Sequence, residues 1–175
     1  MPLDVDATSV RGVWFRHVPA RARPLFSPER PGDGRWQRGE VVEGFYLAEG
    51  EETVWAEWYR SLAERSIPPL RQLPRDLWRF DVKLARVADL SSPERLERIG
   101  LPSPKPDRSQ WRAFQPVGEM LFADGWPAVL YPAAARPESR ALCIFRKGTR
   151  VAGVKTRGRP KRFTEPPVPP RGLRT

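Results

Sequence analysis

Residues 44–65, GFYLAEGEETVWAEWYRSLAER, decide the fold class because their hydrophobic pattern changes period partway along. Gly44 to Ala48 form a short apolar run that predicts a strand. From Glu51 to Arg65 the large apolar side chains recur at helical spacing, and acidic residues occupy the first turn, where the helix dipole favours them. The segment therefore predicts a strand followed by an amphipathic helix.

Strands and helices are interleaved irregularly on both sides of this segment. We expect strands at 10–18, 77–87, 128–131 and 141–145, and helices at 94–99 and from 111 to about 121. The stretch 19–39 is rich in proline, glycine and charge, and long loops of this kind are usually functional or disordered. The fold class expected is α/β (α+β): a flexible N-terminus at 1–9, one compact domain at 10–147, and a basic, disordered tail at 148–175.

The formal net charge of +10 belongs to one end of the chain. Residues 1–139 carry 20 basic and 20 acidic side chains, whereas residues 140–175 carry 11 basic side chains and one acidic one, Glu165. The domain itself is therefore close to neutral, and its function has to be inferred from particular residues rather than from bulk charge.

Several classes of site are excluded by residue type. His17 is the only histidine and Cys143 the only cysteine, which excludes two-histidine metal sites and intrachain disulfides. Cys143 lies in an apolar run and is expected to be a buried thiol. The chain has no nucleotide-binding glycine motif and no serine hydrolase motif. No signal peptide or membrane-length apolar stretch is present, so a cytoplasmic location is expected.

Four residues from successive elements form a candidate site for a phosphorylated, aromatic ligand. Arg16 directly follows the apolar core of a strand, where an unpaired charge is costly. Arg35 lies in the glycine-rich loop, Tyr46 in the next strand, and Glu57 on the helix beside its apolar face. Arginines can hold phosphate, an aromatic ring can stack, and a carboxylate can bind sugar hydroxyls or stabilise a developing cation.

The order of these residues resembles the RES-domain family, the toxin components of bacterial Xre–RES toxin–antitoxin modules. The resemblance runs from about Val13 to Phe145. The stretches that carry it are Phe15-Arg16, Gly34-Arg35-Trp36 with Gly39, Phe45-Tyr46-Leu47, Glu57, Leu73-Pro74, Asp89-Leu90 and Leu130-Tyr131-Pro132.

The resemblance implies a fold related to ADP-ribosyltransferases and an enzyme that degrades NAD⁺ by cleaving the nicotinamide–ribose bond. NAD would be the substrate and not a cofactor, with water or phosphate as acceptor. Arg16 and Arg35 would bind its phosphates, Tyr46 would pack on the nicotinamide side, and Glu57 would hold the ribose and stabilise an oxocarbenium-like transition state. The implied partner is an Xre-type, helix-turn-helix antitoxin that occludes the site.

The chain departs from the family pattern at one position. The family serine normally follows the proline that is here Pro132, but this chain has Ala133 in its place, and Ser139 is six residues further on. His17 replaces a tyrosine that some members carry after the first arginine. A missing hydroxyl removes a contact worth about 1–3 kcal/mol. The prediction is weak NAD⁺ turnover or, alternatively, a catalytically impaired binding module.

The basic tail supports other hypotheses. Arg157-Gly158-Arg159-Pro160-Lys161 resembles an AT-hook, a segment that inserts arginines into the minor groove of A·T-rich DNA. The alternatives are a disordered, solubilising tail and a segment that docks on an acidic antitoxin surface. The impaired module would contact nucleic acid through Arg157, Arg159 and Lys161.

Overall fold

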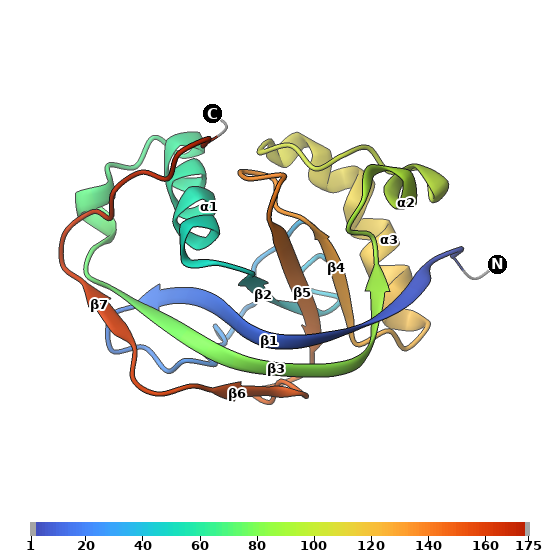
Figure 1. The fold of residues 1–175 in the computed structure, drawn as a ribbon, viewed down its shortest axis with the longest axis horizontal. Helices are drawn as coiled ribbons and strands as arrows, with labels where there is room; N and C mark the ends of the chain where they lie inside the picture. Colours follow the sequence, from blue (N-terminus) through green and yellow to red (C-terminus); the bar gives the residue numbers. More distant parts are fainter. Residues whose placement is uncertain (1–2, 174–175) are drawn as a thin grey trace.

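A seven-stranded sheet in the order β1-β2-β5-β4-β3-β6, with β7 also paired to β3, forms the framework of the protein (Figure 1). The computed structural model describes residues 3–173. The strands are β1 (Asp6–Pro19), β2 (Glu43–Ala48), β3 (Arg75–Asp89), β4 (Ala128–Pro132), β5 (Arg140–Arg146), β6 (Val154–Thr156) and β7 (Lys161–Phe163). The helices are α1 (Glu51–Glu64), α2 (Pro93–Arg98) and α3 (Trp111–Ala123), with 3-10 turns η1 (Pro69–Gln72) and η2 (Arg108–Gln110). The predicted mixed α/β fold is confirmed.

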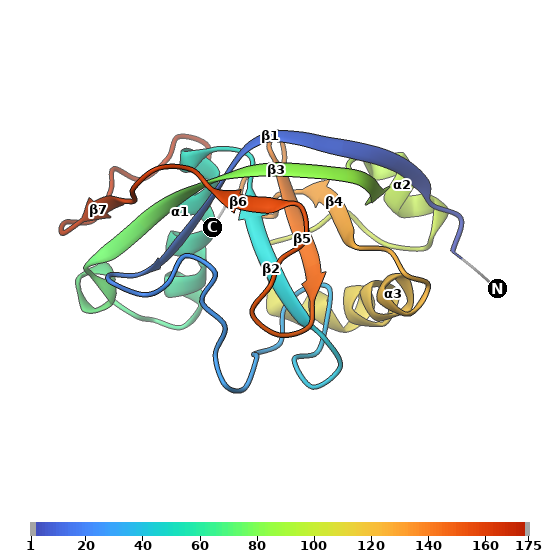
Figure 2. The ribbon, with the colours of Figure 1, turned by 90° about the horizontal axis from the view of Figure 1, so that it is seen from below.

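The strand pairings close into a ring. β1 pairs with β2 at one end and with β3 along most of its length, and the ladder continues through β5 and β4 back to β3. Figure 2 shows β1 and β3 side by side, with β2, β5 and β4 crossing beneath them. The apolar faces of these strands enclose a core that includes Phe45, Phe80, Leu130, Leu142 and Ile144.

Two helices cover this sheet in different places, and both views show them toward opposite ends of the molecule (Figures 1 and 2). The apolar stripe predicted for α1 packs on β1 and β3, with Trp55, Trp58 and Leu62 buried against Leu77. The α3 helix contributes Phe114 and Leu121 to a second cluster that also holds Trp36 of the long loop. The loop that carries Arg35 is thereby anchored between the sheet and α3.

Both ends of the domain differ from the prediction. β1 begins at Asp6, so residues 6–9 of the expected flexible N-terminus at 1–9 are strand, and residues 1–2 lie outside the described part. After Lys147 the expected disordered tail contains β6 and β7, both paired with β3. Val151 and Val154 are buried in the core inside the ring, and the Phe163 ring meets the Trp55 ring edge-on at 4.7 Å. Strands of three residues at a sheet edge are too short to show a period-2 pattern, so the hydrophobic pattern of the tail did not predict them.

The expectation for Cys143 is confirmed. Its thiol is buried in β5, and burial raises its pKa to about 12, so it remains protonated at neutral pH. Among residues 3–173, no helix has both the length and the apolar character needed to cross a membrane.

Candidate functional site

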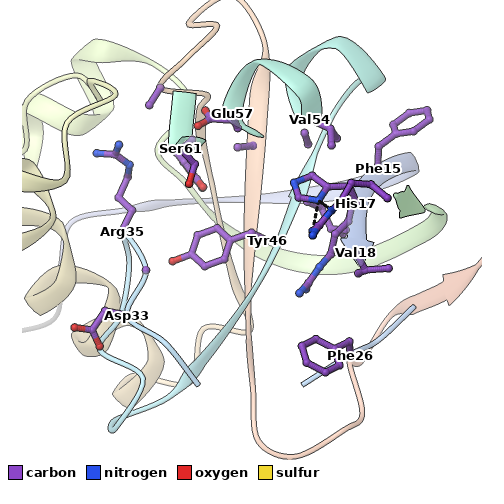
Figure 3. Close-up of a pocket in the computed structure, with 18 of the residues that line it drawn as sticks. Phe15, His17, Val18, Phe26, Asp33, Arg35, Tyr46, Val54, Glu57 and Ser61 are labelled. Atoms are coloured by element: carbon purple, nitrogen blue, oxygen red, sulfur yellow. Dashed lines mark hydrogen bonds between the residues drawn. The ribbon is translucent and has the colours of Figure 1, made fainter. Parts of the chain in front are cut away.

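A cavity of about 510 Å³ opens between the end of β1, strand β2, helix α1 and the long loop. Its lining includes all four residues singled out as the candidate site: Arg16, Arg35, Tyr46 and Glu57. Figure 3 shows Arg35, Tyr46 and Glu57 around this space, with His17 at its other side. Residues that are 41 positions apart in the chain, from Arg16 to Glu57, therefore form one site.

Arg16 is buried beside the Phe45 ring and forms no salt bridge among the described residues. Its guanidinium carbon lies 4.3 Å from the centre of the Phe45 ring, and its buried NH1 has no hydrogen-bond partner among the described residues. Burial and the neighbouring Arg146 lower the pKa of Arg16 to about 10, which leaves it charged at neutral pH. A charged, buried donor without a partner is costly unless a ligand anion completes it.

Arg35 is in a similar condition on the opposite wall. Only 8% of its surface is exposed. Its NH2 donates to the Lys105 carbonyl at 2.6 Å, and its guanidinium lies 5.1 Å from the centre of the Phe114 ring. The NH1 atom, like that of Arg16, is buried and has no partner among residues 3–173. The loop therefore fixes the guanidinium of Arg35 at the cavity, and its NH1 remains without a hydrogen-bond partner among the described residues.

The tyrosine in the cavity supports the glycine loop through its hydroxyl. Tyr46 donates to Gln37 Oε1 at 2.6 Å and accepts the Trp36 N–H at 3.1 Å. A Cβ at Gly34 would overlap the Tyr46 hydroxyl, so only glycine allows this close approach. Because the hydroxyl bonds within the protein, the ring is the part of Tyr46 that can contact a ligand in the cavity. Burial raises the pKa of Tyr46 well above its ordinary value.

Glu57 is the carboxylate of the cavity. It lies on α1, and its Oε1 accepts the backbone N–H of Ala135 at 3.0 Å. Burial raises the pKa of Glu57 above its ordinary value, while the N–H groups of Ala135 and Ala134 and the charge of Arg35 oppose that rise. No salt bridge holds Glu57 among the described residues, and the groups that bond to its carboxylate are backbone N–H groups of the loop after β4.

The loop after β4 supplies backbone donors rather than a hydroxyl. Ala133, the residue at the family's serine position, is fully buried in the core, and its N–H donates to the Ser139 carbonyl. It does not line the cavity, whereas Ala134 does. The Ser139 hydroxyl accepts from Thr53 at 2.7 Å, so it is tied to the start of α1. The structure therefore brings Arg16, Arg35, Tyr46 and Glu57 together but leaves Ala133 outside.

The cavity is also lined by four polar residues that the sequence did not assign to it: His17, Asp33, Ser61 and Arg75. Ser61 lies one helical turn after Glu57, and this i,i+4 spacing was a usable signal. His17 follows Arg16 directly, and the usable signal was that it stands where some family members carry a tyrosine. Arg75 lies on β3, near the part of β1 that holds His17, and only the β1–β3 pairing brings it to the site.

The cavity is dominated by positive charge. No salt bridge joins Arg16, Arg35 or Arg75 to a carboxylate within residues 3–173, and Glu57 is one of only two carboxylates on the cavity wall. Within the same described residues, no group of three His, Cys, Asp or Glu is placed to hold a metal ion. The arrangement suits an anionic small molecule that also has a part complementary to a carboxylate.

A closed α/β domain with one such basic cavity is typical of a protein that binds a small phosphorylated ligand. The chain belongs to the RES domain family, whose sequence model matches residues 11–164. That match includes β6 and β7 and thus extends beyond Phe145, where the resemblance in the sequence ended. No curated protein matches the chain.

Among solved structures, the chain is similar to one from the M. tuberculosis MbcT–MbcA toxin–antitoxin complex. The TM-score is 0.73 at 22% sequence identity, and the match covers 90% of this chain and 87% of the other. At that identity the similarity establishes a common fold.

Proposed function

We propose that this protein is the toxin of a toxin–antitoxin pair and that it degrades NAD⁺ by cleaving the nicotinamide–ribose bond. The observation that carries the proposal is the cavity itself, in which Glu57 lies together with the unpaired, buried donors of Arg16 and Arg35. NAD⁺ supplies what this cavity lacks: a diphosphate for the guanidinium groups and a ribose for the carboxylate. Family membership and the fold shared with a chain of a toxin–antitoxin complex support the same assignment.

The chemistry follows from where charge develops. When the bond between ribose C1 and the pyridinium nitrogen breaks, its electron pair goes to nicotinamide, which leaves neutral. Positive charge then builds on the ribose, and the ionised Glu57 lowers the energy of that state. Water then adds at C1 and loses a proton, giving ADP-ribose. Phosphate as acceptor would give the 1-phosphate ester of the same ribose.

The remaining residues bind the substrate and hold Glu57 in place. Arg16 and Arg35 neutralise the diphosphate, and the Tyr46 ring packs against the planar nicotinamide. The N–H of Ala135 keeps the carboxyl of Glu57 fixed, so the charge is oriented before the ligand arrives. NAD⁺ as substrate would place the action of the protein in the cytoplasm.

The proposal is tested by incubating purified protein with NAD⁺ and following both NAD⁺ loss and nicotinamide release. We expect nicotinamide to appear with the wild type and to be strongly reduced with Glu57→Ala. Running the reaction with and without inorganic phosphate identifies the acceptor from the sugar product. Equal rates for the two proteins contradict the assignment of Glu57, and no nicotinamide release by the wild type contradicts NAD⁺ cleavage.

A binding module without turnover is the second candidate, and the absence of a serine hydroxyl from the loop at 133–135 is the observation that favours it. It predicts saturable NAD⁺ binding by calorimetry with no nicotinamide released. For the partner, we propose a small helix-turn-helix antitoxin that covers the cavity. Co-expression of such a protein encoded next to this chain is then expected to restore cellular NAD⁺ levels.

A further inference from the structure

The only histidine of the chain is fixed at the wall of the cavity by aromatic rings. His17 stacks on Trp55 with ring centres 5.5 Å apart and an interplanar angle of 13°, and it meets Trp58 edge-on at 6.2 Å. Both tryptophans lie on α1, the helix that carries Glu57. The imidazole is therefore held in one orientation relative to Glu57 (Figure 3).

Arg75 determines which imidazole nitrogen carries the proton. Its Nε and NH2 atoms lie 3.2 Å and 2.7 Å from Nδ1 of His17. A guanidinium group has only donors, so Nδ1 must accept with its lone pair and carries no hydrogen. The proton of the neutral ring is then on Nε2, and Nε2–H is the one polar group that His17 has left to offer to the cavity.

The ring is neutral because of its surroundings. Burial lowers the pKa of His17 well below its ordinary value, and the charges of Arg75 on β3 and Arg16 on β1 lower it further. The groups packed on it from α1 are the uncharged rings of Trp55 and Trp58. At physiological pH the residue is thus a donor of fixed direction.

The same wall has two cations, Arg16 and Arg75, that form no salt bridge in the described part of the chain. Burial lowers the pKa of Arg75 to about 10, so it stays charged at neutral pH, as Arg16 does. Neither forms a salt bridge within residues 3–173, and Arg16 has a buried NH1 without a partner. Arg16, His17 and Arg75 all line the same cavity, and two guanidinium groups with one N–H donor are complementary to the oxygens of a phosphate or diphosphate.

We propose that His17, held as its Nε2–H tautomer by Arg75, donates a hydrogen bond to a phosphate oxygen of the ligand, and that His17 and Arg75 extend the diphosphate site of Arg16 and Arg35. Only the identity of the ligand as a dinucleotide rests on the proposed function, because the extended site would take any small diphosphate. His17 and Arg75 thereby become binding residues. Their part is to hold the ligand while Glu57 acts on its ribose.

Because the chain has a single histidine, its imidazole nitrogens can be observed directly. In long-range ¹H–¹⁵N spectra of ¹⁵N-labelled protein at neutral pH, we expect one protonated nitrogen, Nε2, and one unprotonated nitrogen, Nδ1. Inorganic pyrophosphate and ADP-ribose are expected to shift the Nε2 signal saturably, and nicotinamide alone is expected to leave it in place. A proton on Nδ1, or no shift at saturating pyrophosphate and ADP-ribose, overturns the proposal.

Two variants separate the hydrogen bond from the packing. His17→Phe keeps a ring against Trp55 but has no donor, and we expect the affinity for ADP-ribose to fall about tenfold or more, as for a hydrogen bond to a charged group. His17→Gln keeps an N–H donor and is expected to retain affinity within about threefold, since an amide also donates. Equal affinity of wild type and a folded His17→Phe overturns the proposal, and the titration of the wild type stands even where a variant fails to fold.

The two proposals can fail separately. A wild-type protein that leaves NAD⁺ intact but whose Nε2 signal responds to pyrophosphate supports the extended site and refutes NAD⁺ cleavage. A wild-type protein that releases nicotinamide but whose Nε2 signal ignores both diphosphates refutes the extended site alone.

Discussion

Replacing Glu57 by glutamine changes one charge and little else. The glutamine side chain would keep an oxygen that accepts the Ala135 N–H, so the loop after β4 stays in place. A unit charge about 4 Å from the developing cation, at an effective dielectric constant of about 20, contributes about 4 kcal/mol. At about 1.4 kcal/mol per factor of ten, the variant is expected to release nicotinamide about 10³-fold more slowly.

The same substitution is expected to raise the free energy of unfolding at neutral pH. The pKa of Glu57 is raised by burial, so the folded state holds the proton more tightly than the unfolded state. Between the unfolded and folded pKa values the native state binds more protons, and stability falls as pH rises through that window. Glutamine removes this cost, so the two proteins should differ in urea denaturation at pH 7 and converge below the unfolded pKa.

The matched control is Glu52→Gln on the same helix. Its carboxylate is 70% exposed and pairs with Arg136, and a surface ion pair contributes about 0–1 kcal/mol. We expect nearly wild-type turnover from this variant. A folded Glu57→Gln protein that turns over NAD⁺ within about threefold of the wild type would refute the electrostatic role of Glu57, and a loss of stability at pH 7 would refute the account of its pKa.

The same contacts lead to four further predictions. Nicotinamide release should fall as pH drops through the raised pKa of Glu57, because only the ionised carboxylate stabilises the cation; a profile unchanged down to pH 4 would contradict this. Ala134→Ser places a hydroxyl in the cavity and should increase turnover about two- to tenfold. Ala133→Ser buries its hydroxyl in the core and should lower the free energy of unfolding by about 1–3 kcal/mol in urea denaturation. The opposite pattern would indicate that Ala133 belongs to the site. Gly34→Ala should cost about 1–3 kcal/mol by forcing Tyr46 aside, while Gly32→Ala, with open space around it, should be neutral in the same experiment. Truncation after Arg150 should lower the melting temperature, because it removes two buried valines that each contribute about 1.5 kcal/mol or more to stability. Removal of 171–175 alone should leave the melting temperature unchanged. Equal melting temperatures for the two truncated proteins would show that residues 151–170 do not stabilise the fold.

The folded state of the tail changes how the nucleic-acid hypothesis has to be tested. Arg157 pairs with Asp81 at 3.1 Å and Lys161 pairs with Glu51 at 3.2 Å, so two of the three cations of the AT-hook-like segment have partners in the domain. Truncation would remove strands together with charge. Arg159→Ala leaves both pairs intact, and its effect on salt-dependent binding to an A·T-rich duplex isolates the DNA contact.

The positions of most strands and helices could be predicted because the hydrophobic pattern of each segment shows which of its faces is buried. The period-2 pattern of residues 77–87 and the helical stripe of α1 each record which face is buried, so the elements lie where expected, within a few residues. The N-terminal boundary of α2 was equally clear, since Ser92 accepts from the Arg95 N–H and Pro93 occupies the first turn. Arg16 could be singled out because a charge directly after an apolar strand core is costly, and Arg35, Tyr46 and Glu57 because their order in successive elements resembles the RES-domain family.

Long-range pairing could not be predicted in the same way, because a strand edge does not specify its partner. The closure of β1 on β3 is seen only in the folded chain, where it brings Arg75 to His17 and fixes the tautomer of its ring. The fold also places Ala134, and not Ala133, on the cavity wall, and two neighbouring alanines of one loop give no signal of this in the sequence. The amino-acid sequence specifies which elements and which charged groups the protein has. The closure of the sheet determines which of those groups line one cavity, because whether a donor is buried depends on the residues that the paired strands bring next to it.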